Sequence, residues 1–316
     1  MRALITGAAG FVGRHLIAHL LSSGDDVLAL VHRLPRQPLS VKTLPWDISQ
    51  PVCDQHDLHT VVFSFAPEVI YHLAGISLPK LCGEHEPSPA AIAVNVTGTR
   101  HVLQLAQGLD SPPRVLLASS SYVYAPVSKQ HFVVDETYPT EPRRSYGQTK
   151  LLAEQHGLAA VAEHQADVVI ARAFNHTGPG QEPQYMLPEW AKQVAEGCNP
   201  LQVQNRQANL DLTDVRDVVR AYRLLMQHGT SGGVYNVGSG INRCSGEVLE
   251  HLLQLAQVEP KIAEPETAGW KQGPVADITR LRQATHWEPE ISLEQTIFDT
   301  LADWRSRTNS KWAGVG

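Results

Sequence analysis

A tyrosine followed by a lysine four residues later is the pair of side chains whose spacing most favours catalysis in this sequence. Of the eight tyrosines, only Tyr146 has this partner, Lys150, in the segment YGQTK. On a helix, residues four apart lie on one face. A phenol titrates at about 10, too high for proton transfer at neutral pH, and a nearby ammonium group lowers that pKa because it favours the phenolate. The pair therefore predicts a tyrosine that exchanges a proton with a substrate.

Three consecutive serines precede this pair by about 25 residues, in the segment ASSSYVYA (118–125) that follows an apolar run. A serine hydroxyl at a strand end can hydrogen-bond an oxygen that becomes charged during a reaction. It can equally serve only to satisfy the end of the strand. The three serines by themselves leave both interpretations open.

A glycine-rich turn near the amino terminus predicts a dinucleotide site. The segment GAAGFVG spaces Gly7, Gly10 and Gly13 three apart, between an expected strand and an expected helix. The first glycine permits a tight turn, the second lets the backbone approach a pyrophosphate, and the third allows close packing of helix on strand. The helix then directs the positive end of its dipole at the phosphates. We expect Phe11 and Val12, inside this turn, to contact the cofactor as well.

The end of the second expected strand indicates which dinucleotide binds. An NAD site usually has an acidic residue there, which bonds the ribose 2′-hydroxyl. Here Val31, His32 and Arg33 occupy that position, and a guanidinium group can bind a 2′-phosphate that a carboxylate would repel. We therefore expect NADP(H) rather than NAD(H), with Arg33 on the 2′-phosphate and His32 assisting. Asp47 and Ile48, just past the third strand, either hold the adenine edge or form a plain turn.

These side chains need a scaffold in which strands and helices alternate. Continuous apolar runs separated by helical patterns predict buried parallel strands with helices on both faces. The order is that of a doubly wound dinucleotide-binding (Rossmann) fold of the α/β class. The expected strands cover 2–6, 27–31, 69–75, 114–119 and 167–174, and the expected helices cover 11–21, 88–108, 145–164, 186–197 and 214–228.

The texture of the sequence changes after residue 174. The segment NHTGPGQEPQ is rich in Pro, Gly and Asn and predicts a loop that leaves the sheet, and the chain from about 244 is mostly helical in pattern. We expect a dinucleotide-binding domain of residues 1–173 plus about 211–238. A smaller, discontinuous α/β substrate lobe is expected from about 174–210 plus 239–316.

Composition narrows the class of protein. The net charge is −6 and the basic residues are scattered, which disfavours nucleic-acid binding. No apolar segment has the length and flanks of a membrane span or a secretion signal. The four cysteines form no Cys-x-x-Cys pair, so we expect a cytoplasmic protein with reduced thiols. The pairs His15/His19 and His56/His59 have no third ligand at a suitable spacing, and we interpret them as helical surface residues rather than a metal site.

Seven motifs together resemble the extended short-chain dehydrogenases/reductases of the nucleotide-sugar epimerase/dehydratase family. They are TGAAGFVG, HLAG, NVTGT, SSSYVY, YGQTK, RAFNHTGPG and VYNVGSG, and the resemblance covers essentially the whole chain. It implies that Tyr146 is the acid/base and that Lys150 holds the nicotinamide ribose while tuning Tyr146. Counting back from Ala125, it also implies that Ser120 is the catalytic serine, with Ser119 and Ser121 structural.

The resemblance extends to residues around this centre. It implies that Asn95, in NVTGT, supports the site. The other implied cofactor contacts are Leu73, Ala74, Gly75 and Ala173, and the implied substrate contacts are Ser77 and Asn175, the latter at the diphosphate.

The residues after Ser120 bear on the reaction. Sugar 4,6-dehydratases of the family carry a carboxylate directly after the catalytic Ser or Thr, whereas this chain has Ser121 and Tyr122. UDP-sugar 4-epimerases generally have the acidic strand end that Val31 replaces here. We therefore expect NADP(H)-dependent reduction of the 4-keto group of a nucleotide-linked deoxyhexulose.

The second lobe is similar to that of GDP-4-keto-6-deoxymannose reductases, which form GDP-rhamnose. Val203 and Asn205 match a segment of that group that lies over the nucleotide. Leu210 departs from the pattern, because it replaces an arginine that commonly pairs with the substrate phosphates. Lys271, or else Arg206, is expected to supply the charge, although either could be a plain surface residue.

Two alternatives stay open: a 4-epimerase or 4,6-dehydratase of the same family, and a dinucleotide-sensing regulator without chemistry. The intact Tyr146/Lys150 pair disfavours the regulator. Few charges occur at about 90–107 and 146–164, and the family often dimerises through the equivalent helices. We therefore expect a homodimer.

Overall fold

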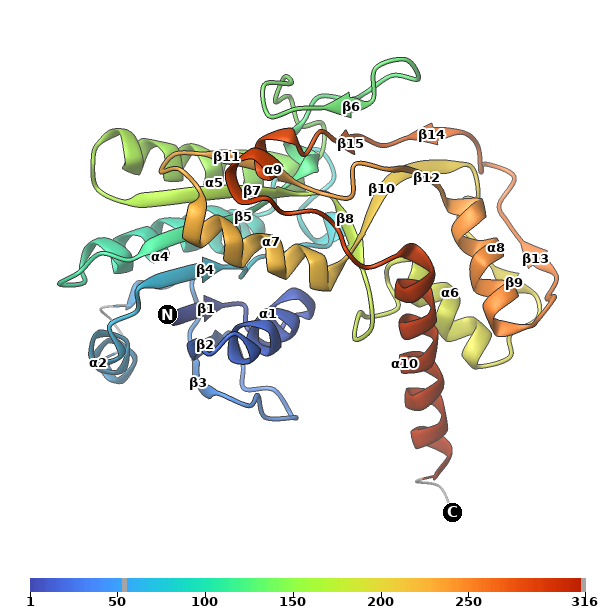
Figure 1. The fold of residues 1–316 in the computed structure, drawn as a ribbon, viewed down its shortest axis with the longest axis horizontal. Coiled ribbons are helices and arrows are strands. Elements are labelled where there is room, and N and C mark those ends of the chain that lie inside the picture. Colours follow the sequence, from blue (N-terminus) through green and yellow to red (C-terminus); the bar gives the residue numbers. More distant parts are fainter. Residues whose placement is uncertain (53–55, 314–316) are drawn as a thin grey trace.

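The computed structural model describes residues 1–52 and 56–313, and Cys53 lies outside this part of the chain. Its centre is a seven-stranded parallel sheet with the strand order β11-β7-β5-β4-β1-β2-β3 (Figure 1). The strands are β1 (Arg2–Thr6), β2 (Asp26–Val31), β3 (Lys42–Pro45), β4 (Val69–His72), β5 (Arg114–Ser120), β7 (Asp167–Ala173) and β11 (Val234–Val237). The expected doubly wound α/β fold is thereby confirmed.

Both faces of this sheet are buried, which explains why its strands are continuous apolar runs rather than alternating ones. Within β1, Leu4 faces one hydrophobic cluster and Ile5 the other, and both are fully buried. On the Ile5 side pack α1 (Phe11–Ser22) and α7 (Val215–His228). On the Leu4 side pack α2 (His56–Phe65), α4 (Gly98–Gln107) and α5 (Ser145–Ala162).

The expected helix at 88–108 is divided into three segments. They are α3 (Pro89–Ala91), a π-helical segment η3 (Ile92–Thr97) and α4. A π segment inserts an extra residue into the helical repeat, and such insertions are frequent at functional sites. This one contains Asn95.

A second layer of structure lies beyond the carboxyl ends of the sheet strands (Figure 1). Its sheet centres on β10 (Ala208–Asp214), with β12 (Asn242–Cys244) and β14 (Lys271–Gln272) at either side and β8 (Asn175–Thr177) also paired to β10. Helices α6 (Met186–Ala195), α8 (Ser245–Ala256) and α10 (Leu293–Ala313) pack on it around a separate core. The remaining elements are η2 (Pro79–Leu81), η4 (Ser121–Val123), β6 (Val133–Val134), β9 (Leu201–Gln202), β13 (Ile262–Ala263), β15 (Val275–Ala276) and α9 (Thr279–Thr285).

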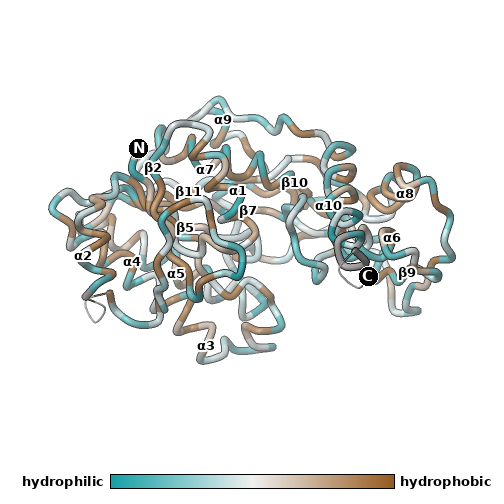
Figure 2. The backbone as a smooth tube through the Cα atoms, turned by 90° about the horizontal axis from the view of Figure 1, so that it is seen from below, coloured by the Kyte–Doolittle hydropathy of each residue, from teal (hydrophilic) through white to brown (hydrophobic). Residues whose placement is uncertain are grey.

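The chain enters this second body after β7, returns to the large sheet for α7 and β11, and then crosses back. Figure 2 shows α6, α8 and α10 gathered at one end of the molecule, away from α2 and α4, with apolar segments inside each part. The boundaries proposed from the sequence for two domains stay predictions.

His15 and His19 of α1, expected at the surface, are both half-buried, and burial lowers the pKa of each. The His15 Nε2 lies 2.8 Å from the backbone oxygen of Pro179, because α1 packs against the loop that leaves β8. Among the described residues there is no group of three His, Cys, Asp or Glu side chains arranged to hold a metal ion. In the same part of the chain, no helix is both long and apolar enough to cross a membrane.

Candidate active site

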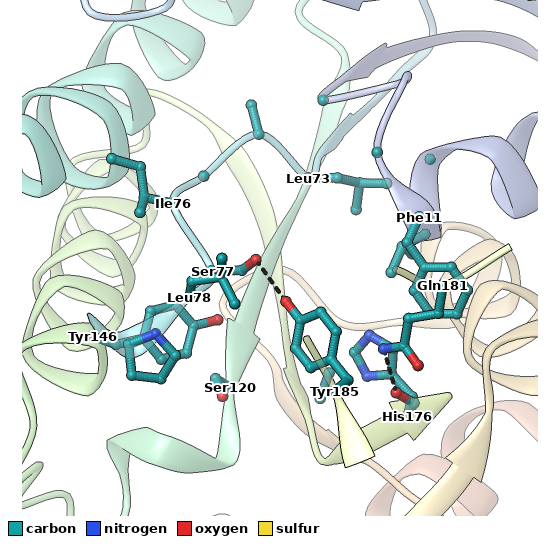
Figure 3. A pocket seen from close by; sticks show the side chains of 18 of the residues that line it. Phe11, Leu73, Ile76, Ser77, Leu78, Ser120, Tyr146, His176, Gln181 and Tyr185 are labelled. Carbon is teal, nitrogen blue, oxygen red and sulfur yellow. Dashed lines mark hydrogen bonds between the residues drawn. The ribbon is translucent and has the colours of Figure 1, made fainter. Parts of the chain in front are cut away.

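A cavity of about 830 Å³ opens at the carboxyl ends of the sheet strands (Figure 3). Strands β1 and β4 are neighbours in the sheet although the chain leaves β1 towards β2. At such a switch point the connections diverge and leave a crevice, where doubly wound folds bind ligands. One wall comes from the loops of the large sheet, and the other from β10 and the start of α6.

The glycine turn forms one end of this cavity. Gly7 has a φ of +71°, and a Cβ there would lie 2.6 Å from the backbone nitrogen of Ala74. A Cβ at Gly13 would lie 2.6 Å from the backbone oxygen of Gly7. Gly10 begins α1 without a side-chain cap, and it lines the cavity with Phe11. The first amides of α1 are thus left to a ligand, so this turn fits a dinucleotide pyrophosphate.

The residues at the end of β2, expected to select the dinucleotide, also line the cavity. His32 and Arg33 follow β2, are exposed, and stand at the cavity wall. Asp47 lies opposite in a tight turn, where it accepts hydrogen bonds from the Ser49 amide at 3.0 Å and the Ser49 hydroxyl at 2.7 Å. Ile48 lines the cavity as well. Asp47 therefore forms a turn at the cavity wall, and its contact with the adenine stays a prediction.

Tyr146 and Ser120 lie close together on the wall of the cavity (Figure 3). Ser120 ends β5, where its hydroxyl accepts a 3.3 Å hydrogen bond from the Tyr122 amide. Burial raises the pKa of Tyr146, and the hydrogen bond with Ser120 opposes that shift without cancelling it. The phenol is therefore in its protonated form at neutral pH, ready to donate.

The sequence predicts a lowered pKa for Tyr146, whereas burial raises it overall and outweighs what Lys150 contributes. The Lys150 Nζ is 5.9 Å from the centre of the Tyr146 ring and donates a 2.8 Å hydrogen bond to the backbone oxygen of Ala118. Burial lowers the pKa of Lys150 to about 8. The ammonium group is hydrogen-bonded to the backbone at Ala118, and burial is the largest influence on the pKa of Tyr146.

Asn95 joins the helix layer to the cavity. Its Oδ1 accepts a 2.7 Å hydrogen bond from the Ile76 amide, and its Nδ2 donates to the Ile76 oxygen at 3.1 Å. The same Nδ2 donates to the Thr149 hydroxyl at 3.0 Å. A normal helical turn would rotate this side chain elsewhere, so the π segment positions it. Asn95 thus supports the loop that carries Ser77.

The three consecutive serines have different surroundings. The Ser119 hydroxyl donates to the buried carboxylate of Glu154 at 2.5 Å. That carboxylate also pairs with Arg172, whose Nη2 lies 2.8 Å from it. Both charged side chains are almost fully buried, so this group ties β5, α5 and β7 together. The hydrogen bond to Glu154 supports a structural role for Ser119, although all three serines line the cavity.

The other end of the cavity contains residues that the sequence did not single out. The Tyr185 hydroxyl lies 3.4 Å from the hydroxyl of Ser77, across the cavity from one wall to the other (Figure 3). Gln181 is held by Thr177, whose hydroxyl donates to it at 2.7 Å. Met186 also lines this end. Gln181 lies in the loop after β8, and Tyr185 and Met186 lie at the start of α6. Only their position after NHTGPG could have pointed to them.

Most of the predicted site residues come together. Those that line the cavity are Gly7, Gly10, Phe11, Val12, Gly13, His32, Arg33, Asp47, Ile48, Leu73, Ala74, Gly75, Ser77, Ser120, Tyr146, Ala173 and Asn175. Lys150 and Asn95 lie just behind the wall, each close to where a Cβ on Gly75 would be.

Three residues expected to bind substrate lie outside the cavity wall. Val203 is buried in the core of the second body. Asn205 donates a 2.8 Å hydrogen bond to the backbone oxygen of Gly269, and Lys271 is exposed on β14. Arg206, the other cation considered, pairs with Glu264 at 2.9 Å. Their roles towards substrate stay predictions.

Comparison with known proteins bears on this geometry. A sequence model of the NAD dependent epimerase/dehydratase family matches residues 3–238. The GDP-6-deoxy-D-mannose reductase of Pseudomonas aeruginosa is 31% identical over 98% of this chain and 99% of its own length. Among solved structures, RMD from Pseudomonas aeruginosa complexed with NADPH is 30% identical, with a TM-score of 0.84 over 97% of this chain and 100% of that one. A putative epimerase from Burkholderia cenocepacia J2315 is 29% identical, with a TM-score of 0.83 over 96% and 98% of the two chains.

Proposed function

Because this chain belongs to the NAD dependent epimerase/dehydratase family, we propose that it uses NADPH to reduce the 4-keto group of a nucleotide-linked deoxyhexulose. The substrate closest to this proposal is GDP-4-keto-6-deoxymannose, whose reduction forms GDP-rhamnose. The relative that is 31% identical is a GDP-6-deoxy-D-mannose reductase, and the two chains match over nearly their full lengths.

The observation that carries the proposal is the absence of a carboxylate beside Ser120. Asp47 is the sole Asp or Glu among the described residues that line the cavity, and it stands with His32 and Arg33 at the cofactor end. Dehydration needs an acid and a base at the sugar to remove water. Reduction of a ketone needs one proton donor, which Tyr146 supplies.

The residues at the glycine turn fit NADPH, which when bound supplies a hydride to the 4-carbon of the sugar. The uncapped start of α1 receives the pyrophosphate. Arg33 and His32 bind the 2′-phosphate, since no acidic residue ends β2 to repel it. Leu73, Ala74 and Ala173 line the path towards Tyr146.

The chain's own residues handle the proton. The Tyr146 hydroxyl donates its proton to the oxygen of the 4-keto group as that oxygen gains charge. Ser120 donates a hydrogen bond to the same oxygen, a preorganised electrostatic contribution. The Lys150 ammonium group then stabilises the Tyr146 phenolate and holds the nicotinamide ribose.

Further contacts position the sugar nucleotide. We assign Ser77 and Asn175 to the sugar and its diphosphate, and Val203 and Asn205 to the nucleotide, with Lys271 kept as a candidate cation for the phosphates. We further propose a homodimer in the cytoplasm. Two apolar side chains on α5, Leu152 and Leu158, are more than a third exposed, which supports a helical interface.

The proposal is tested by NADPH oxidation with a panel of 4-keto-6-deoxy sugars linked to GDP, UDP or dTDP. Turnover with NADPH and a 4-keto sugar, together with a product reduced at C4, is the expected result. Interconversion of 4-hydroxy sugars without net NADPH consumption would instead identify an epimerase. Tight NADPH binding with no conversion of any member of the panel would contradict the proposal.

A further inference from the structure

No positively charged side chain lines the substrate end of the cavity among the described residues. Among the described residues that line the cavity, Arg33 and His32 are at the cofactor end. The remaining basic side chain among the described residues that line the cavity is His176. Burial lowers its pKa, so it is neutral. A nucleoside diphosphate carries negative charge that protein sites normally pair with guanidinium or ammonium groups. If the proposed substrate binds here, its diphosphate requires a cation from just beyond the wall.

Arg243 stands next to that wall. Strands β10 and β12 are antiparallel, and Arg243 is the direct partner of Leu210 in their register. Residues directly opposite each other in such a pair project to the same face of the sheet. Leu210 lines the cavity, so Arg243 belongs to the cavity face of this sheet. The separation of such opposite Cβ atoms is about 5 Å, which an arginine side chain can bridge.

Arg243 has no counter-ion among the described residues. No Asp or Glu oxygen lies within 4.0 Å of it in that part of the chain, and its Nε is buried without a hydrogen-bond partner. An unpartnered buried donor of a charged group is costly. The contrast with Arg206 is direct, because Arg206 forms a 2.9 Å ion pair with Glu264.

The acidic residues around Arg243 have other partners. Arg243 lines a smaller cavity of about 200 Å³ that shares Leu212 with the large one. Asp214 in that cavity pairs with Arg216 at 2.7 Å, and Glu290 pairs with Arg220 at 3.0 Å. The pKa of Glu294 is lowered mainly by hydrogen bonds from its own backbone amide and from Ser292, with Arg243 the smallest contributor, and Glu294 lies 3.9 Å from His251. The guanidinium group is therefore not committed to these acids.

We propose that Arg243 is the cation that binds the diphosphate of the substrate, by extending its guanidinium group over Leu210 into the cavity. This inference rests on the proposed function, which requires a nucleotide-linked sugar. It adds a specificity residue on β12, a strand that contributes nothing else to the site.

The affinities of Arg243→Ala for GDP, guanosine and NADPH distinguish a contact to the diphosphate from contacts to the nucleoside or to the cofactor. Removing a charge-assisted hydrogen bond from a partly buried site should reduce GDP affinity by about ten- to a hundredfold. Guanosine lacks the phosphates, so its affinity should stay unchanged, as should that of NADPH. The matched control is Arg282→Ala, which removes an exposed arginine of α9 that pairs with Glu288. Titration calorimetry gives all three affinities, and the melting temperature without ligand reports folding.

A sharper test moves the arginine from position 243 to position 210. In the double variant Leu210→Arg/Arg243→Ala, the cation sits at the position that lines the cavity, and GDP affinity should recover most of the loss. If Arg243→Ala does not fold, Arg243→Lys should still reduce GDP affinity, because an ammonium group cannot bind two oxygens in the fork geometry of a guanidinium. Unchanged GDP affinity in Arg243→Ala, or a loss confined to Lys271→Ala, would overturn the inference while leaving the proposed function intact. If the wild-type protein binds no nucleoside diphosphate, both this inference and the proposed function are overturned.

Discussion

The Asn95 side chain donates a 3.0 Å hydrogen bond to the hydroxyl of Thr149, the residue directly before Lys150. Through its two other hydrogen bonds it holds the backbone of Ile76. One carboxamide thus joins the loop on the substrate side of the cavity to the helix that carries both catalytic candidates.

Asn95→Ala should impair both folding and turnover. The change leaves the Ile76 amide without its partner and the Ile76 oxygen with only the Cys82 thiol at 3.3 Å, and a buried group left without its hydrogen bond costs about 1–3 kcal/mol. Urea unfolding should show this decrease in stability, and kcat should fall by tenfold or more as Lys150 and the Ser77 loop lose their common support. Thr149→Val removes the Asn95–Thr149 hydrogen bond and the bond from the Thr149 hydroxyl to the backbone oxygen of Tyr146, but leaves both bonds at Ile76, and it should be intermediate. Equal effects of the two variants would contradict this role of Asn95.

Tyr146→Phe should reduce turnover by about a hundredfold to ten-thousandfold, the usual contribution of a positioned proton donor. The ring remains, so NADPH affinity measured by fluorescence should be nearly unchanged. Tyr122→Phe is the matched control, since its ring meets that of Tyr146 edge-on at 5.7 Å yet Tyr122 is exposed. Activity at the wild-type level in Tyr146→Phe would remove it from the mechanism.

Activity should decline as the pH rises through the pKa of Lys150, which burial lowers to about 8. Below that pH the ammonium group stabilises the Tyr146 phenolate left by proton transfer, and above it this stabilisation disappears. The pH dependence of kcat from pH 6 to about 10 measures the effect. Lys150→Arg stays protonated throughout this range, so its residual activity should lack this decline. If kcat declines in the same way at high pH in both proteins, a group other than Lys150 causes the decline.

His72 should make the protein sensitive to acid. Its ring nitrogens lie 2.7 Å from the Thr6 hydroxyl and 3.0 Å from the Thr99 hydroxyl, and complete burial lowers its pKa to about 3. An unfolded chain takes up the proton at about pH 6.5. Between these values the unfolded state binds more protons, so the free energy of unfolding falls as the pH decreases, by at most about 1.4 kcal/mol per pH unit.

The variant His72→Gln tests this linkage because glutamine does not titrate. Urea unfolding at pH 7 should show the variant to be less stable than the wild type, since its side chain fits the two threonines less well. The difference should shrink towards pH 5, where keeping His72 neutral destabilises only the wild type. Parallel curves for the two proteins would show that His72 does not govern the acid limb.

Arg33→Ala should lower NADPH affinity by about ten- to a hundredfold, the decrease expected when a charge-assisted hydrogen bond to the 2′-phosphate is removed. NADH lacks that phosphate, so its affinity should change little. Arg36→Ala, an exposed arginine nearby that does not line the cavity, is the control. Equal losses for the two cofactors would remove Arg33 from the phosphate.

The local sequence determined much of the fold and of the reactive centre. Continuous apolar runs predict strands that are buried on both faces. The spacing of Gly7, Gly10 and Gly13 predicts a tight turn, in which Gly7 and Gly13 leave no room for a Cβ. The spacing of Tyr146 and Lys150 places both on one helical face. These features depend on residues close together in the chain, where backbone geometry alone links sequence to position.

Only the tertiary structure decided the environment of these groups. The order of the strands brings Ser120 to Tyr146 in a desolvated cavity, and desolvation raises the pKa of the phenol although the sequence predicted the opposite. The π segment that aims Asn95 at Ile76 interrupts what reads as one helix. Tyr185 reaches Ser77, and Arg243 stands beside Leu210, only through the packing of segments far apart in the chain. Burial and long-range pairing depend on the whole fold, so no local pattern could specify them.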